Sequence, residues 1–142
     1  FKVAKGQINN QNILKKILDY SPNLIVINAT SILSKKFLNF FKYRIINIHA
    51  GILPYYRGSG CNVWPFYHNE LEYVGITVHF VNSGVDTGNI ILQKRSNLTF
   101  ADNTHTVGCK NAVSIDLFHK SEWIENCIYF IFNFYTCLGF NH

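Results

Sequence analysis

The sequence of 142 residues contains no methionine. A complete open reading frame normally keeps its initiator or an internal Met, whereas this chain begins at Phe1. We therefore expect a fragment or a processed product of a longer protein. The N-terminal residues lack the apolar segment of a signal peptide, but in a fragment that absence carries no information about location.

Long apolar runs are also missing. No stretch reaches the roughly 18 charge-free residues of a membrane-spanning helix, although residues 127–140 come closest, and no membrane partner is expected. Hydrophobic residues make up 48% and charged residues 15%, which excludes a disordered or fibrous protein. The apolar, aromatic tail 121–142 is interpreted as a buried helix or as sequence unrelated to the rest, in preference to a membrane span.

The four cysteines form no C-x-x-C pair, which argues against a thiolate zinc site and a redox pair. Their spacing favours a reducing compartment, and we expect a cytoplasmic protein. The net charge is +5, but the 13 Lys and Arg residues are scattered, without a basic run or a nucleic-acid motif. Composition therefore does not point to a nucleic acid as the partner.

What the sequence does contain is an alternation of helical and strand patterns. Helices are expected at residues 9–20, 35–41, 61–69 and 104–119, and strands at 24–27, 44–48, 74–81 and 89–95. Ser34 is expected to cap the second helix. Strands that alternate with helices imply a parallel sheet with right-handed crossovers, and the last two strands could pair as a hairpin across the turn 84–88. The chain is therefore expected to fold as one α/β domain.

Polar side chains gather where the strands of this sheet end. Asn47 and His49 lie two residues apart on one strand, so they point to the same side, at the edge where α/β sheets bind ligands. A glycine loop containing Arg57 follows and suits an anionic group. His79 lies near the end of the next strand, and Asp86 lies in the turn after it. Together they supply an oxyanion donor, a proton acceptor and a carboxylate that orients an imidazole.

Four motifs in this order resemble the folate-dependent formyltransferases, which include glycinamide ribonucleotide, methionyl-tRNA and sugar N-formyltransferases. The motifs are Asn47-Ile48-His49, Leu53-Pro54-x-x-Arg57-Gly58, Gly75-Ile76-Thr77-Val78-His79 and Val85-Asp86-Thr87-Gly88-Asn89-Ile90. The resemblance is densest at residues 45–93 and weaker back to residue 9 and on to about residue 117. It implies a Rossmann-like, three-layer αβα domain with a mostly parallel sheet.

The resemblance also implies a reaction and a set of catalytic residues. The family transfers a formyl group from 10-formyltetrahydrofolate to a primary amine, and its Asn, His and Asp fall here on Asn47, His49 and Asp86. The Asn47 amide and a protonated His49 would donate hydrogen bonds to the tetrahedral oxyanion. Asp86 would raise the proton affinity of His49 and assist proton transfer. No metal is required.

Binding residues follow from the same resemblance. Segments 30–33 and 82–85 would frame the pteridine with backbone groups, and Arg57 and Gly58 would contact the acceptor. The folate-binding residues expected are Ser31, Ile32, Leu33, His79, Asn82, Ser83 and Gly84. Alternatively, His79 is a strand residue whose side chain only packs in the interior and does not contact the ligand.

The chain departs from the family pattern in three places. The first strand–helix units of the family domain are absent, so residues 1–120 are expected to be a partial catalytic domain, about its second half. Ala50 follows His49, where many members have Pro or Gly. The tail 121–142 matches nothing in the family.

Several functions remain open. The sequence of the loop at residues 55–62 favours a small anionic acceptor such as an amino sugar nucleotide, and methionyl-tRNA is the alternative that would bring in a nucleic acid. A 10-formyltetrahydrofolate hydrolase, with water in place of the amine, and a non-catalytic remnant are further alternatives. A different kind of function, a non-haem iron site built from His49, His79 and Asp86, is also kept open. The sequence does not indicate an oligomeric state.

Overall fold

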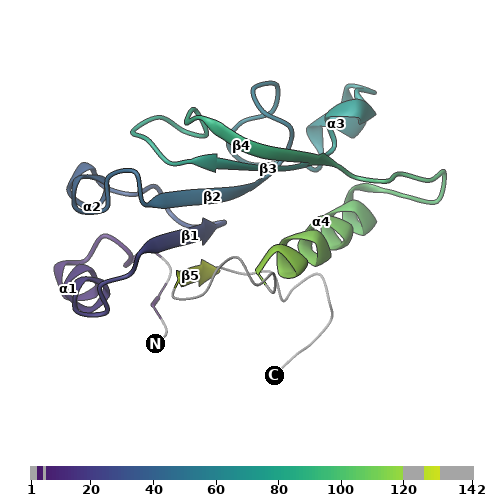
Figure 1. The fold of residues 1–142 in the computed structure, drawn as a ribbon. Helices are drawn as coiled ribbons and strands as arrows, with labels where there is room; N and C mark the ends of the chain where they lie inside the picture. Colours follow the sequence, from purple (N-terminus) through teal and green to yellow (C-terminus); the bar gives the residue numbers. More distant parts are fainter. Residues whose placement is uncertain (1–2, 5, 120–126, 132–142) are drawn as a thin grey trace.

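The computed structural model describes residues 3–4, 6–119 and 127–131. The elements and their order are shown in Figure 1. The helices are α1 (Gln11–Asp19), α2 (Lys35–Phe40), α3 (Trp64–Tyr67) and α4 (Thr104–His119), with a 3₁₀ turn at η1 (Leu71–Tyr73). The strands are β1 (Leu24–Asn28), β2 (Ile45–Ala50), β3 (Gly75–Phe80), β4 (Ile90–Arg95) and β5 (Cys127–Ile131).

One sheet collects all the described strands, in the order β4-β3-β2-β1-β5. The α/β class expected from the sequence is confirmed, and the sheet is mixed. β1 pairs in parallel with β2 and with β5, whereas β3 runs antiparallel to both β2 and β4. Parallel pairing needs a crossover such as α2. The β3–β4 hairpin expected from the sequence is present, and residues 81–89 connect its two strands.

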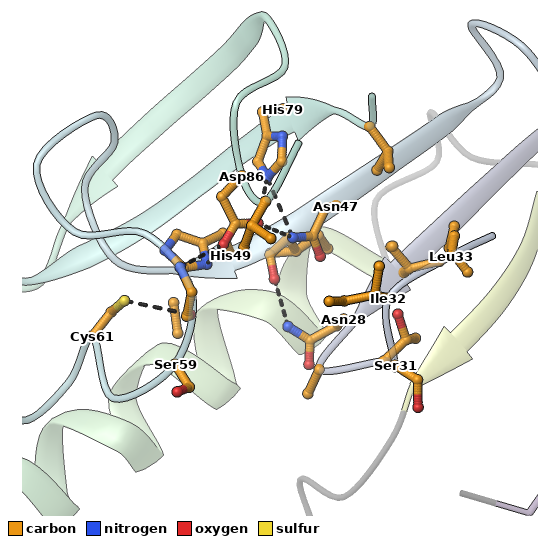
Figure 2. Close-up of a pocket in the computed structure, with 18 of the residues that line it drawn as sticks. Asn28, Ser31, Ile32, Leu33, Asn47, His49, Ser59, Cys61, His79 and Asp86 are labelled. Carbon is orange, nitrogen blue, oxygen red and sulfur yellow. Dashed lines mark hydrogen bonds and ion pairs between the residues drawn. The ribbon is translucent and has the colours of Figure 1, made fainter. Parts of the chain in front are cut away.

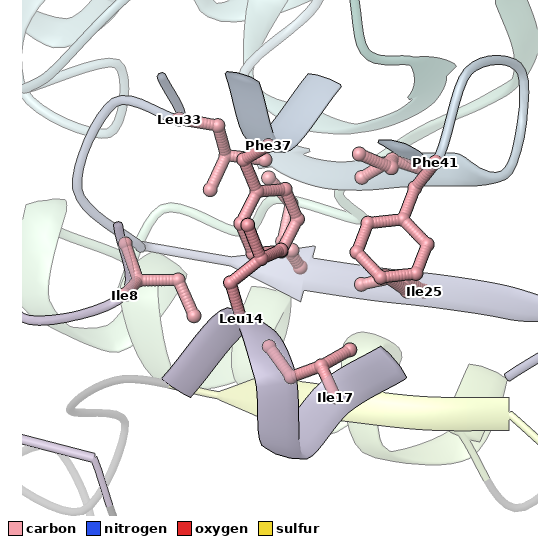
Figure 3. Packing of buried hydrophobic residues seen from close by; sticks show 9 residues of the cluster. Ile8, Leu14, Ile17, Ile25, Leu33, Phe37 and Phe41 are labelled. Carbon is pink, nitrogen blue, oxygen red and sulfur yellow. The ribbon is translucent and has the colours of Figure 1, made fainter. Parts of the chain in front are cut away.

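The two faces of the sheet bury separate apolar clusters. Leu14 and Ile17 of α1 and Phe37 of α2 pack on Ile25 and Ile45, which point to one face (Figure 3). The second cluster, on the other face, comprises Val26, Ile46, Ile48, Ile76 and Val78, each at most 5% exposed. Because α4 contacts β2, we assign α4 to this second face, which gives three layers.

Local sequence explains most element ends. Asn10 and Ser34 cap α1 and α2 by accepting a hydrogen bond from a backbone N–H of the first turn, and the cap by Ser34 was expected. The helix expected at 61–69 is shorter than its pattern suggested. Residues 61–63 form a turn instead, and α3 is a single turn with Pro65 near its start.

Part of the apolar tail joins the sheet. Cys127–Ile131 forms β5, which pairs with β1 from Leu24↔Cys127 to Asn28↔Ile131. The buried-helix interpretation is therefore wrong for these residues, whose β-branched and aromatic composition suits a strand. Residues 121–126 and 132–142 lie outside the described part. Among the described helices, none has the length and apolar character needed to cross a membrane.

Candidate active site

Strand register brings the predicted polar residues together on one face. Asn47 and His49 alternate with Ile46 and Ile48, so they point away from the second cluster. Antiparallel pairing places His79 of β3 directly opposite Asn47. The turn after β3 returns over this face and carries Asp86 into the group (Figure 2).

Asp86 is the hub of the cluster, with a side chain 11% exposed. Its Oδ1 accepts a hydrogen bond from Asn47 Nδ2 at 3.0 Å and lies 3.3 Å from His79 Nε2. Its Oδ2 accepts from the backbone N–H of Gly58 at 2.8 Å and lies 3.3 Å from His49 Nδ1. The carboxylate thus ties β2, β3 and the glycine loop to one point.

These contacts keep Asp86 ionised. Burial alone would raise its pKa, but the hydrogen bond to His79, the charges of the two histidines and the Gly58 N–H outweigh burial and lower the pKa to about 2. A full negative charge therefore faces His49 at neutral pH.

Both ring nitrogens of His49 face oxygen atoms of the site. Its Nε2 lies 2.9 Å from the backbone carbonyl of Tyr56, and because a carbonyl only accepts, Nε2 carries the hydrogen. In neutral imidazole the unprotonated nitrogen is then Nδ1, which faces Asp86. The Tyr56 hydroxyl is itself hydrogen-bonded to Glu70, which anchors the loop that supplies the carbonyl.

The pKa of His49 lies below its ordinary value. Burial is the largest cause, and it exceeds the opposing effects of Asp86 and of the Tyr56 carbonyl. The sequence-based expectation that Asp86 makes His49 a stronger base is therefore correct for the pair alone, but the net shift is downward. At neutral pH His49 is a proton acceptor, with Asp86 placed to stabilise the imidazolium that forms.

Asn47 directs its N–H groups inward. Nδ2 donates to Asp86 and lies 3.3 Å from Nε2 of His79. His79 is 2% exposed and donates Nδ1–H to the carbonyl of Phe80, while its Nε2 faces both Asn47 Nδ2 and Asp86 Oδ1. For Asn47 to stabilise an oxyanion, the substrate oxygen must take over one of these N–H contacts.

A cavity of about 620 Å³ opens beside the cluster. It is lined by Asn47, His49 and Asp86 and by every residue expected to bind folate: Ser31, Ile32, Leu33, His79, Asn82, Ser83 and Gly84. Its size suits a pteridine-sized ligand, and Ile27, Leu33 and Val81 give it apolar walls.

The expected acceptor residues separate in space. Gly58 lines the large cavity. Arg57 lines a smaller cavity of about 320 Å³, and Asp86 lines both cavities. Sequence reasoning missed Asn28 and the Tyr56 carbonyl as parts of the site. Asn28 carried only a weak signal, a polar residue directly after an apolar strand, and a backbone carbonyl carries none.

Other chemistries fit this geometry less well. Burial raises the pKa of the Cys61 thiol to about 11, so the thiol is not an activated nucleophile at neutral pH. The iron-site alternative from His49, His79 and Asp86 is not supported, because within residues 3–4, 6–119 and 127–131 no group of three His, Cys, Asp or Glu side chains is arranged to hold a metal ion.

Comparison with known proteins places the chain in a family. Residues 2–113 match the family model described as formyl transferase. A methionyl-tRNA formyltransferase from Thermodesulfovibrio yellowstonii is 34% identical over 108 residues, which cover 75% of this chain and 35% of that protein. The chain thus spans about a third of the length of the curated relatives it matches.

Solved structures share the fold. A phosphoribosylglycinamide formyltransferase from Anaplasma phagocytophilum superposes with a TM-score of 0.73 at 20% identity, covering 91% of this chain and 74% of that one. A formyltransferase from Anoxybacillus kamchatkensis, solved with UDP-4,6-dideoxy-4-formamido-L-AltNAc and tetrahydrofolate, gives 0.62 at 24% identity, covering 92% and 71%. The family match spans most of the chain, and the chain belongs to the formyl transferase family.

Proposed function

We propose that this site transfers a formyl group from 10-formyltetrahydrofolate to a primary amine. The observation that carries the proposal is the convergence of Asn47, His49 and Asp86 beside a cavity that the expected folate residues line. Membership of the formyl transferase family supports the donor, and a related structure holds tetrahydrofolate. A cytoplasmic location is part of this proposal.

The residues suit an addition–elimination reaction. The amine nitrogen bonds to the formyl carbon, and the carbonyl electrons move to oxygen to give a tetrahedral oxyanion. Asn47 donates an N–H to that oxygen. The nitrogen loses a proton, which His49 Nδ1 accepts beside Asp86, and this proton is delivered to the folate N10 as the carbon–N10 bond breaks. The products are tetrahydrofolate and the formamide.

The acceptor is proposed as an amine on an anionic carrier. A small acceptor such as an amino sugar nucleotide is supported by the fold match to the sugar-nucleotide enzyme, and methionyl-tRNA by the 34% identical relative. Arg57, beside the smaller cavity that borders Asp86, is the residue we assign to the anionic group.

An acceptor panel tests the function. The 142-residue chain is first titrated with tetrahydrofolate and followed by tryptophan fluorescence, to which the half-exposed Trp64 contributes. It is then incubated with 10-formyltetrahydrofolate and one of four partners: glycinamide ribonucleotide, a UDP-linked 4-amino sugar, methionyl-tRNA or buffer alone. Folate binding with formamide formation on one amine is expected. If formate is released in buffer alone as fast as the donor is consumed with any amine, the protein is a hydrolase. If the chain self-associates and binds no tetrahydrofolate, it is a non-catalytic remnant.

The pH dependence of transfer tests the role of His49. A base must be unprotonated, and the pKa of His49 lies below 6.5. We expect kcat/KM to stay constant from weakly alkaline pH down to 6.5 and to fall about tenfold per pH unit below the His49 pKa. A rate that rises as the pH drops through this range would instead mean that the protonated ring acts, as a donor to the oxyanion.

A further inference from the structure

Asn62 is a polar residue of the large cavity to which the proposed reaction gives no role. It comes directly after Cys61 at the end of the glycine loop, and its side chain is partly exposed. Its Oδ1 accepts a hydrogen bond at 2.9 Å from Nδ2 of Asn111, a residue of α4 that is only 2% exposed. Asn62 thus connects the wall of the cavity to the buried side of a helix.

The partners of Asn111 determine how the Asn62 amide is oriented. A carbonyl oxygen only accepts hydrogen bonds, so the end of Asn111 that lies 3.3 Å from the Gly75 carbonyl is its NH₂ group. The oxygen of Asn111 accepts from the Ser96 hydroxyl at 2.6 Å. Because the NH₂ of Asn111 also meets Asn62, Asn62 presents its oxygen there and turns its own NH₂ away.

The NH₂ group of Asn62 is available to a ligand. It has no hydrogen-bond partner in the part of the chain that the structure describes, and it is not among the buried atoms that are closed to solvent. The residue lines the large cavity, and its oxygen is already committed to Asn111. Asn62 therefore offers the cavity a hydrogen-bond donor whose orientation is set in advance.

The position of Asn62 indicates which substrate receives this donor. Residues 31–33, which are expected to frame the folate, lie on one side of the catalytic cluster (Figure 2). Ser59 and Cys61 lie on the other side, and Asn62 follows them in the chain. A folate seated on residues 31–33 leaves this loop side of the cavity for the amine acceptor.

We propose that Asn62 Nδ2 donates a hydrogen bond to an uncharged carbonyl oxygen of the amine acceptor, such as an amide or ester oxygen, and so helps to select it. This inference rests on the proposed formyl transfer. Arg57, the charged donor of the same loop, is assigned to the anionic group, whereas the neutral amide of Asn62 suits a neutral oxygen. The contact is made to the carrier and not to the reacting nitrogen, so Asn62 is a specificity residue.

Asn62→Asp tests the donor alone. The carboxylate keeps an oxygen for Asn111 Nδ2, so the contact with α4 is retained, but the NH₂ is replaced by an oxygen that repels a carbonyl oxygen. With the amine that the panel identifies, kcat/KM for the amine is expected to fall about tenfold, the effect of one lost hydrogen bond. The melting temperature and the affinity for tetrahydrofolate are expected to change little.

Asn62→Leu and Ser59→Asp are the matched variants. Asn62→Leu removes the donor without adding a charge, and it is expected to show a similar fall together with a lower melting temperature, because the contact with Asn111 is lost. Ser59→Asp places the same charge on the same loop, where it lines the same cavity. It is expected to lower kcat/KM for the amine much less than Asn62→Asp does.

The outcomes separate the inference from the function on which it rests. A fall toward the amine in both Asn62 variants, with normal tetrahydrofolate affinity, supports the role of Asn62. Normal kinetics in Asn62→Asp would make the residue structural, and normal kinetics in Asn62→Leu, or an equal fall in Ser59→Asp, would make the loss an effect of charge; each result overturns the inference. A fall in tetrahydrofolate affinity also overturns it, because the donor then belongs to the folate. If the unmutated chain binds no tetrahydrofolate and transfers no formyl group, the proposed formyl transfer itself is wrong.

Discussion

Replacing Asp86 with Asn is expected to lower kcat for formyl transfer about 10³-fold while the chain stays folded. The substitution removes the negative charge that faces His49 and that would stabilise the imidazolium. Asn is the gentlest replacement, because Asp86 has a φ of +49°, a left-handed conformation that Asn tolerates. Its amide oxygen also retains an acceptor for the Gly58 N–H.

The measurement combines kcat, tetrahydrofolate affinity and thermal melting. Asp102→Asn is the control, since Asp102 also has a lowered pKa, with a hydrogen bond from Lys110 as the largest cause, but lies outside both cavities. It is expected to lose stability and keep its rate. Asp86→Asn with more than a tenth of the original kcat would remove Asp86 from the reaction. In Asp86→Asn, the acidic fall of the remaining kcat/KM is expected to shift to lower pH, because Asp86 raises the pKa of His49 and the variant lacks that charge.

The positions of Asn47, His49 and Asp86 could be predicted because they depend on short-range rules. Residues two apart on a strand share a face, and the turn after β3 begins one strand away from β2. The place of His79 opposite Asn47 depends on the antiparallel register, which no local pattern determines. Its hydrogen bonds to Phe80 and Asn47 therefore became visible only in the fold.

The chemistry of His49 shows a second limit of sequence reasoning. A neighbouring carboxylate suggests a raised pKa, and only the burial of the ring shows that desolvation is larger. The Tyr56 carbonyl, which sets the tautomer, belongs to the backbone and leaves no trace in residue identity. Likewise, Cys127–Ile131 reads equally well as a helix segment or a strand, because its partner β1 lies about a hundred residues away in the chain.

Gly51→Ala is expected to lower kcat about 100-fold by displacing His49. A Cβ at this position would lie 2.9 Å from His49 Nε2 and 2.7 Å from Cys61 Cβ, both closer than carbon atoms of this kind approach. The backbone cannot easily move away, since the Gly51 carbonyl accepts a buried hydrogen bond from Thr77 at 2.7 Å. The ring must therefore shift, which breaks its contact with the Tyr56 carbonyl.

Gly6→Ala separates this effect from ordinary backbone strain. Gly6 has a φ of +81° and no atom within 4 Å of the added Cβ, so its variant is expected to lose about 1 kcal/mol of stability and retain its kcat. For Gly51→Ala, melting, kcat and tetrahydrofolate affinity are measured together, and folate affinity is expected to change less than kcat. A folded Gly51→Ala chain with kcat within twofold of the original would mean that the Tyr56 contact does not hold His49 in its reactive orientation. A selective loss of kcat would show that catalysis depends on this backbone contact as well as on the three side chains.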